Sequence, residues 1–153
     1  MIFHKNKLFF FFVFLFLLIL GLFVFKIRTS AKNIISINGH ELAAELANTP
    51  AEQYRGLSNR ESLCADCGML FIFPDQAPRT FVMREMNFSL DFVWIINNEV
   101  VKIDENAMPE GKVYKNNYLS GQPVDKVLEV NAGWAAKNNI KVNDHVQFNS
   151  SVK

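Results

Sequence analysis

Two cysteines form the pair of side chains whose spacing most directly suggests chemistry, in the segment Cys64-Ala65-Asp66-Cys67. A turn of this length can bring two Cα atoms within the 4.4 to 6.8 Å that a disulfide requires, and an oxidising compartment favours that bond. Thioredoxin-like chemistry needs the first cysteine at a helix N-terminus in a βαβ unit, but this pair precedes a glycine and an apolar segment. We predict a small structural disulfide, and free thiols, redox work and metal binding stay open as alternatives.

A zinc site would need two further ligands beside these cysteines. The histidines that could supply them are His4, His40 and His145, and His4 precedes a long apolar segment. No Gly-rich phosphate loop, serine nucleophile elbow or histidine-containing acid/base set accompanies them. The sequence therefore predicts neither a metal nor a cofactor.

Four charged residues lie close to apolar segments and are candidates for a ligand site: Arg60, Arg84, Asp91 and Glu129. Arginine side chains can clamp an anionic ligand through paired hydrogen bonds. The alternative is that these charges form ion pairs or hold loop backbones, which is how half-buried charges are usually accommodated. We expect a structural role for Asp91 and a ligand-binding role for Arg84.

A long apolar segment near the N-terminus indicates in which compartment of the cell these residues lie. Leu8 to Phe25 contains eighteen residues without a charge, and such a helix would be about 27 Å long, close to the hydrocarbon thickness of a bilayer. We predict a transmembrane signal-anchor over residues 8–27, extended past Lys26 by Ile27. A cleaved signal peptide is the alternative, although only the weak site Thr29-Ser30-Ala31 follows.

The anchor divides the chain into a cytoplasmic segment (1–7), the membrane helix (8–27), a polar linker (28–33) and one domain (34–153). Charges on the two sides of the helix are balanced, so the outward orientation follows from the plan of a signal-anchor. Five of the sixteen basic residues lie at or before Lys32, which leaves eleven against all fifteen acidic residues, a net charge of −4. This acidic balance and the absence of a basic stripe argue against nucleic-acid binding.

Short apolar segments separated by turn residues predict a mainly β domain. Asn38-Gly39 and Asn97-Asn98 are typical of tight hairpin turns, and Asn48 or Thr49 can cap a short helix that ends near Gly56. Asn131 is expected to cap a second helix that runs to Lys137, and the polar segment 105–124 to form a loop with at most a short strand. The expected strands are 34–37, 40–47, 69–73 (closed by Pro74), 80–83, 90–96, 99–104, 127–130 and 142–148. We predict a small sandwich or distorted barrel with two short helices, without alternating βαβ units.

Three ordered blocks of sequence then become recognisable together: ELANTPAEQYRGLSNRESL, GMLFIFPDQAPRTFVMREMNFSLDFVWIINNEVVKI and VLEVNAGWAAKNNIKVNDHV. Over residues 40–148 the chain resembles the domain of unknown function 192 family, also called uncharacterised protein family 0127. The resemblance implies a compact mainly β fold without an assigned activity. It places the family's polar and glycine pattern on Glu52, Arg55, Gly56, Arg60, Gly68, Met83, Arg84, Asp91, Glu129, Gly133 and Trp134. Val82 stands where the family usually has tryptophan, which weakens a ligand-stacking role there.

These observations predict a membrane-anchored, extracytoplasmic binding or accessory module of the cell envelope. Its expected partners are the membrane through residues 8–27, and an anionic small molecule or an envelope protein. The alternative is an enzyme, either a hydrolase near Arg84 and Asp91 or a thiol redox protein using Cys64 and Cys67. A structural protein that assembles only with itself is the third hypothesis.

Overall fold

The computed structural model describes residues 33–149, which contain nearly all of the predicted domain. The predicted membrane helix at 8–27 lies outside the described residues. Neither helix within residues 33–149 is long and apolar enough to cross a bilayer.

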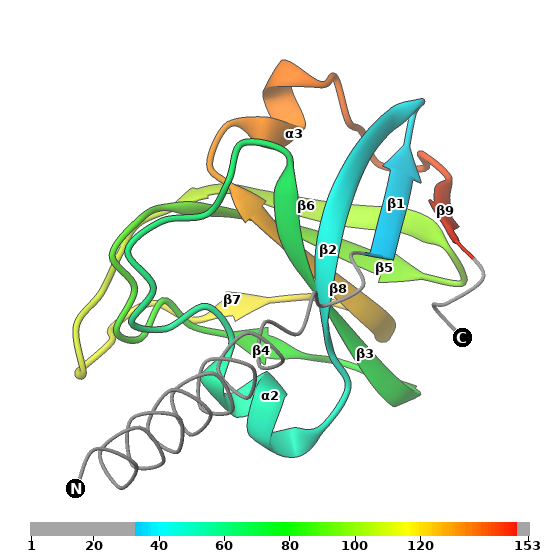
Figure 1. Cartoon of the computed structure of the whole chain (residues 1–153). Coiled ribbons are helices and arrows are strands. Elements are labelled where there is room, and N and C mark those ends of the chain that lie inside the picture. Colours follow the sequence, from blue (N-terminus) through cyan, green and yellow to red (C-terminus); the bar gives the residue numbers. More distant parts are fainter. Residues whose placement is uncertain (1–32, 150–153) are drawn as a thin grey trace, which may run out of the picture. The chain divides into compact units, whose positions relative to one another are not determined.

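The domain is mainly β, with one curled sheet of seven strands in the order β6-β5-β8-β3-β2-β1-β9 and a separate pair, β4 and β7 (Figure 1). Two short helices complete it, as predicted. The elements are β1 (Asn33–Ile37), β2 (His40–Ala47), α2 (Pro50–Arg55), β3 (Cys67–Ala77), β4 (Thr80–Phe81), β5 (Leu90–Ile96), β6 (Glu99–Ala107), β7 (Tyr118–Leu119), β8 (Val124–Asn131), α3 (Trp134–Lys137) and β9 (Val146–Phe148).

The sheet curls into a half-barrel whose two outer strands approach each other at one end. The amide of Val146 in β9 donates to the carbonyl of Asn98, and the amide of Val100 in β6 donates to the carbonyl of Asp144. These bonds satisfy backbone groups that an open sheet edge would expose. The observed fold is therefore closer to the predicted distorted barrel than to a sandwich of two sheets.

Apolar side chains cover both faces of the curled sheet, because consecutive residues of a strand point to opposite faces. Val93 and Leu128 belong to the first core, which α3 closes with Trp134. Phe92 and Trp94 belong to the second core, which lies beneath β4, β7 and the turn after α2. Neighbouring positions of β5 and β8 thus contribute to different cores.

Local turn and cap signals are confirmed at the residue level. Asn38 and Gly39 have φ of 52° and 78°, as a type I′ hairpin turn requires. Thr49 caps α2 and forms a reciprocal capping box with Glu52, while the amide of Gly56 closes the helix. The hydrogen bond from the Thr49 hydroxyl is also the largest cause that lowers the pKa of Glu52.

One feature of the topology was not predicted, because β2 and β3 pair in parallel. Parallel neighbours need a crossover connection, and the chain makes it through α2 and residues 56–66. The sheet is therefore mixed and contains one βαβ unit. This crossover places the turn after α2 over the second core.

Several strand boundaries also differ from the prediction: β6 runs to Ala107 and β8 spans Val124–Asn131, both longer than expected. The third strand does not stop at Pro74 but runs to Ala77, because the pairing with β8 is interrupted between Ile72 and Ala77 and the exposed proline needs no ladder hydrogen bond there. The last strand begins at Val146, not at Val142. Asn143 has φ of 74°, and the amide of Lys141 donates to the Asp144 carboxylate, so residues 141–144 form a turn.

Two further expectations fail at chain reversals. The predicted strand at 80–83 ends at Phe81, because the Met83 carbonyl accepts the amides of Met86 and Glu110 in a turn. Asn131 does not cap α3. Its side-chain amide donates to the carbonyls of Leu63 and Cys64, and the helix begins after Gly133, whose φ is 81°.

Candidate functional site

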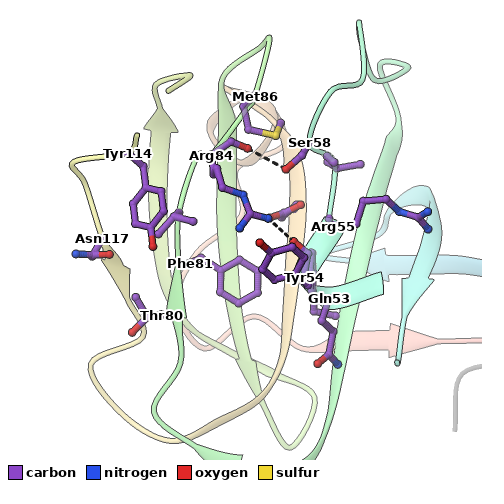
Figure 2. Close-up of a pocket in the computed structure, with 15 residues that line it drawn as sticks. Gln53, Tyr54, Arg55, Ser58, Thr80, Phe81, Arg84, Met86, Tyr114 and Asn117 are labelled. Atoms are coloured by element: carbon purple, nitrogen blue, oxygen red, sulfur yellow. Dashed lines mark hydrogen bonds between the residues drawn. The ribbon is translucent and has the colours of Figure 1, made fainter. Parts of the chain in front are cut away.

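A cavity of about 400 Å³ lies over the second core. Its volume falls in the range of small-molecule sites, roughly 300 to 1,000 Å³. Figure 2 shows Thr80, Tyr114 and Asn117 on one side of it and Gln53 and Tyr54 on the other. The full lining is Gln53, Tyr54, Arg55, Gly56, Leu57, Ser58, Phe71, Thr80, Phe81, Val82, Arg84, Met86, Tyr114, Asn117 and Glu129.

An aromatic cluster forms the apolar wall of the cavity. The Phe81 ring meets Phe71 edge to face with centroids 4.8 Å apart, and it also contacts Phe92 and Trp94 at 5.6 and 5.5 Å. Such aromatic pairs restrict each other's orientation. The half-buried Phe81 ring thus packs against the second core and also lines the cavity.

The opposite rim is a loop that Glu110 holds in place. Its carboxylate accepts hydrogen bonds from the amides of Lys115 and Asn116 at 3.1 and 3.3 Å and from the side chain of Asn116. Tyr114 and Asn117 flank these residues and line the cavity. The loop is thereby fixed at the cavity although it contains no helix or strand.

Glu129 in β8 is the buried ionisable group of the cavity. It is 6% exposed, and its Oε2 has no hydrogen-bond partner. Burial raises the pKa of Glu129 to about 8, although the positive charge of Arg60 acts to lower it. Because a buried carboxyl without a partner is costly, this group needs a specific reason to be present.

Two glycines determine how closely the chain approaches Glu129. A Cβ at Gly68 would lie 2.7 Å from the Glu129 carbonyl, so β3 and β8 could not keep this spacing with a larger residue. A Cβ at Gly56 would lie 3.4 Å from Phe71 and 3.9 Å from Glu129 Oε2. The unpaired oxygen therefore lies close to the turn that ends α2.

Arg84 crosses the mouth of the cavity. Its Nη2 donates to the Tyr54 carbonyl at 2.7 Å, its guanidinium carbon lies 4.1 Å from the centre of the Tyr54 ring, and Ser58 donates to its carbonyl (Figure 2). Within residues 33–149 Arg84 forms no ion pair with a carboxylate. A guanidinium has five N–H donors, so this side chain keeps donors for a ligand.

The other two charged candidates lie elsewhere. Arg60 forms a bidentate pair with Glu45, with N–O distances of 2.6 and 2.8 Å, and this bond raises its pKa. Asp91 is fully buried and accepts hydrogen bonds from the amides of Asn106 and Ala135 at 2.9 and 3.1 Å. The structure thus brings Arg84 and Glu129 to one cavity and leaves Arg60 and Asp91 out of its lining.

Cys64 and Cys67 form a disulfide with their Cα atoms 5.2 Å apart, in the turn that leads into β3. His40 and His145 are exposed. Among residues 33–149, no three His, Cys, Asp or Glu side chains are grouped to hold a metal ion.

Sequence reasoning did not include most of the cavity wall, notably Tyr54, Ser58, Thr80, Tyr114 and Asn117. These residues come from three segments that meet only through the crossover at α2 and the pairing of β4 with β7. No local pattern marks them. The single local hint was the position of Arg84 directly after an apolar segment.

Comparisons with known proteins agree with this architecture. Residues 33–148 match the family model described as DUF192, uncharacterized ACR. No curated protein matches the chain. A Sinorhizobium meliloti 1021 protein described as a proposed transcription regulator is 30% identical, with a TM-score of 0.72, over 77% of this chain and 94% of that one. A Novosphingobium aromaticivorans DSM 12444 protein of unknown function is 34% identical, with a TM-score of 0.67, over 78% and 89%.

Proposed function

Because this chain belongs to the DUF192 family, whose description assigns no activity, we propose a function from its own cavity: the domain binds a small molecule there. The unpaired Oε2 of the buried Glu129 is the observation that carries this proposal. A carboxyl that folding removes from water and leaves without a partner destabilises the free protein. A ligand that supplies the missing hydrogen bond recovers that free energy on binding.

The remaining features of the cavity support a ligand of mixed character. Phe71, Phe81 and Met86 offer apolar contact, while Arg84 keeps free donors at the mouth. Pockets that combine apolar walls with a few convergent polar groups are typical small-molecule sites. An anionic group on the ligand would find its partner in Arg84.

The proposal is tested by screening a chemically mixed fragment library against the full-length protein with ligand-observed NMR. Thr80→Trp places a bulky side chain in the cavity, and Val142→Trp adds a bulky side chain at a position that is 50% exposed and outside the lining. We expect fragments to bind the wild type and the Val142 variant but not the Thr80 variant. Absence of any binding, or equal binding by the two variants, would refute the proposal.

We further propose that this binding domain is displayed outside the cytoplasm and tethered by residues 8–27. The support is the uninterrupted apolar segment and the paired cysteines, which suit an oxidising compartment. Full-length protein should stay with membranes during alkaline extraction and keep its N-terminal segment. A soluble species that begins near Lys32 would overturn this part of the proposal without affecting the cavity.

An enzyme is the second candidate, and Glu129 is the observation that favours it. A buried carboxyl whose pKa is raised to about 8 can give or accept a proton near neutral pH. A site that joins Arg84 with Asp91 gains no support, because Asp91 is bound to backbone amides outside the cavity. The regulator description of the Sinorhizobium protein is not extended to this acidic domain, which carries no basic stripe.

A further inference from the structure

The cavity contains one acidic and one basic side chain that are not paired with each other. Glu129 lies beneath Gly56 and Phe71, with one oxygen unpaired. Arg84 lies against Tyr54 at the mouth, and no carboxylate within residues 33–149 pairs with it. The cation that lowers the pKa of Glu129 is Arg60, which is already bound to Glu45.

We infer that the ligand of this cavity is a compact zwitterion, with a primary ammonium group bound by Glu129 and a carboxylate bound by Arg84. This inference rests on the proposed small-molecule site and names the chemical class that it takes. Free amino acids and short peptides share this chemistry.

The charges explain why a ligand with one charge would fit less well. An anion without an ammonium group would leave the Glu129 oxygen unpaired, and a cation without a carboxylate would leave the Arg84 donors unused. Glu129 Oε2 and the Cζ atom of Phe71 both lie within 4 Å of the point where a Cβ at Gly56 would stand. An ammonium group bound over the face of that ring would gain cation–π attraction.

The walls supply the third part of the recognition. The lining also includes Leu57, Phe81 and Met86, which suit an aliphatic or aromatic side chain of the ligand. Arg55 also lines the cavity, but its guanidinium points away from Arg84 in Figure 2. Arg84 therefore remains the cation available for a carboxylate.

This binding mode predicts the direction in which the affinity for the ligand changes with pH. The titratable and charged groups around Glu129 are Arg55, Arg60, Arg84, Tyr54 and Tyr114. Below its pKa of about 8 the carboxyl is mostly protonated, so binding an ammonium group requires loss of that proton. Affinity should therefore rise with pH, by up to about tenfold per unit between about pH 6 and 8. If neutral Glu129 instead donates to an acceptor on the ligand, affinity falls as pH rises.

The test measures affinity by calorimetry on the full-length protein with matched probes. L-phenylalanine, L-leucine and glycyl-phenylalanine carry both charges, while 2-phenylethylamine and 3-phenylpropanoate carry one each. We expect at least one zwitterion to bind tenfold or more tightly than both single-charge probes, with affinity rising from pH 6 to 8. Comparison of the amino acids with the dipeptide identifies which source of this chemistry fits.

Variants assign each charge to its residue. Glu129→Gln should remove the rise with pH, Arg84→Gln should remove the advantage over 2-phenylethylamine, and Glu41→Gln, an exposed control, should change neither. If Glu129→Gln does not fold, the pH profile of the wild type still shows whether affinity rises or falls with pH.

Three outcomes would overturn this inference and leave the proposed site standing: single-charge probes that bind as well as the zwitterions, affinity that falls as pH rises, or fragments that bind while every zwitterion fails. Failure of all fragments would remove both.

Discussion

Two buried carboxylates on neighbouring strands show different solutions to the same physical problem. Asp91 in β5 and Glu129 in β8 are one position apart in the strand register, because Asp91 pairs with Val130 and Phe92 pairs with Glu129. They therefore face opposite cores. The Asp91 oxygens each accept a backbone amide, whereas Glu129 Oε2 accepts none. The satisfied Asp91 carboxylate holds the fold together, and the unsatisfied Glu129 beside the cavity is the feature from which we propose a ligand site.

Replacing Asp91 should have the largest effect on stability. Asp91→Ala leaves the amides of Asn106 and Ala135 without acceptors, and each lost bond to a charged group costs about 1.5 to 3 kcal/mol. We expect the free energy of unfolding in urea at pH 7 to fall by about 3 to 5 kcal/mol. Asp91→Asn keeps one acceptor oxygen and should lose about half as much. A loss below about 1 kcal/mol in the alanine variant would remove the contrast with Glu129.

Glu129→Gln, in contrast, should increase the stability of the fold at high pH. The folded pKa of about 8 lies above the ordinary 4.5, so between these values the folded protein holds a proton that the unfolded chain has lost. Stability of the wild type therefore falls as pH rises through this window, by up to about 1.4 kcal/mol per unit. The glutamine variant lacks this contribution and should be more stable than wild type at pH 8 by about 4 kcal/mol.

Urea unfolding of both proteins from pH 5 to 8.5 measures this difference. Groups other than Glu129 titrate in both proteins and cancel in the comparison. A difference that does not change with pH would show that Glu129 titrates as an ordinary surface carboxyl. Glu41→Gln, at an exposed position, serves as the control.

The two carboxylates also show what could be read from sequence and what could not. Turn residues and caps act within a few positions, and for this reason the hairpin at Asn38-Gly39, the helix at 50–55 and the strand at 90–96 are predicted correctly. The structural role expected for Asp91 fits its hydrogen bonds from the backbone amides of Asn106 and Ala135. The face on which each carboxylate lies depends on strand register, which no local pattern specifies.

Features that depend on distant segments were missed for the same reason. The parallel pairing of β2 with β3 follows from the crossover through α2, and the cavity wall follows from β4 meeting β7. Pro74 suggested the end of a strand because proline cannot donate a ladder bond, but the bulge at this point requires none. The sequence could thus propose Arg84 and Glu129 as separate candidates without showing that they line one cavity.

Reducing the disulfide should have a smaller effect that leaves both carboxylates in place. Cys67 directly precedes Gly68, whose Cα packs against the Glu129 backbone. Closing such a short loop contributes about 2 kcal/mol in the chain-entropy model, so the reduced protein should remain folded. The difference between wild type and Glu129→Gln at pH 8 should survive reduction. Its loss would mean that the disulfide turn positions Glu129.

Mass spectrometry under non-reducing conditions provides the companion measurement for this pair. Protein isolated from membranes should show Cys64 linked to Cys67. Alkylation of both thiols without prior reductant would contradict the linkage.

Arg84→Ala should have the smallest effect on stability, and it separates binding from folding. The variant loses the hydrogen bond from Arg84 to the Tyr54 carbonyl and the stacking of the guanidinium on the Tyr54 ring. Together these contacts contribute about 1 kcal/mol to the free energy of unfolding. No buried group is left unpaired beyond that carbonyl, in contrast to Asp91→Ala. Because Arg84 has no carboxylate partner within residues 33–149, its charge remains available to a ligand. Binding of carboxylate-bearing probes should therefore fall at least tenfold while the unfolding midpoint in urea changes little.

Arg84→Lys should keep part of the affinity, because it retains the charge without the planar fork. A large loss of stability in Arg84→Ala, or unchanged binding by that variant, would place Arg84 with Asp91 among the residues that hold the fold.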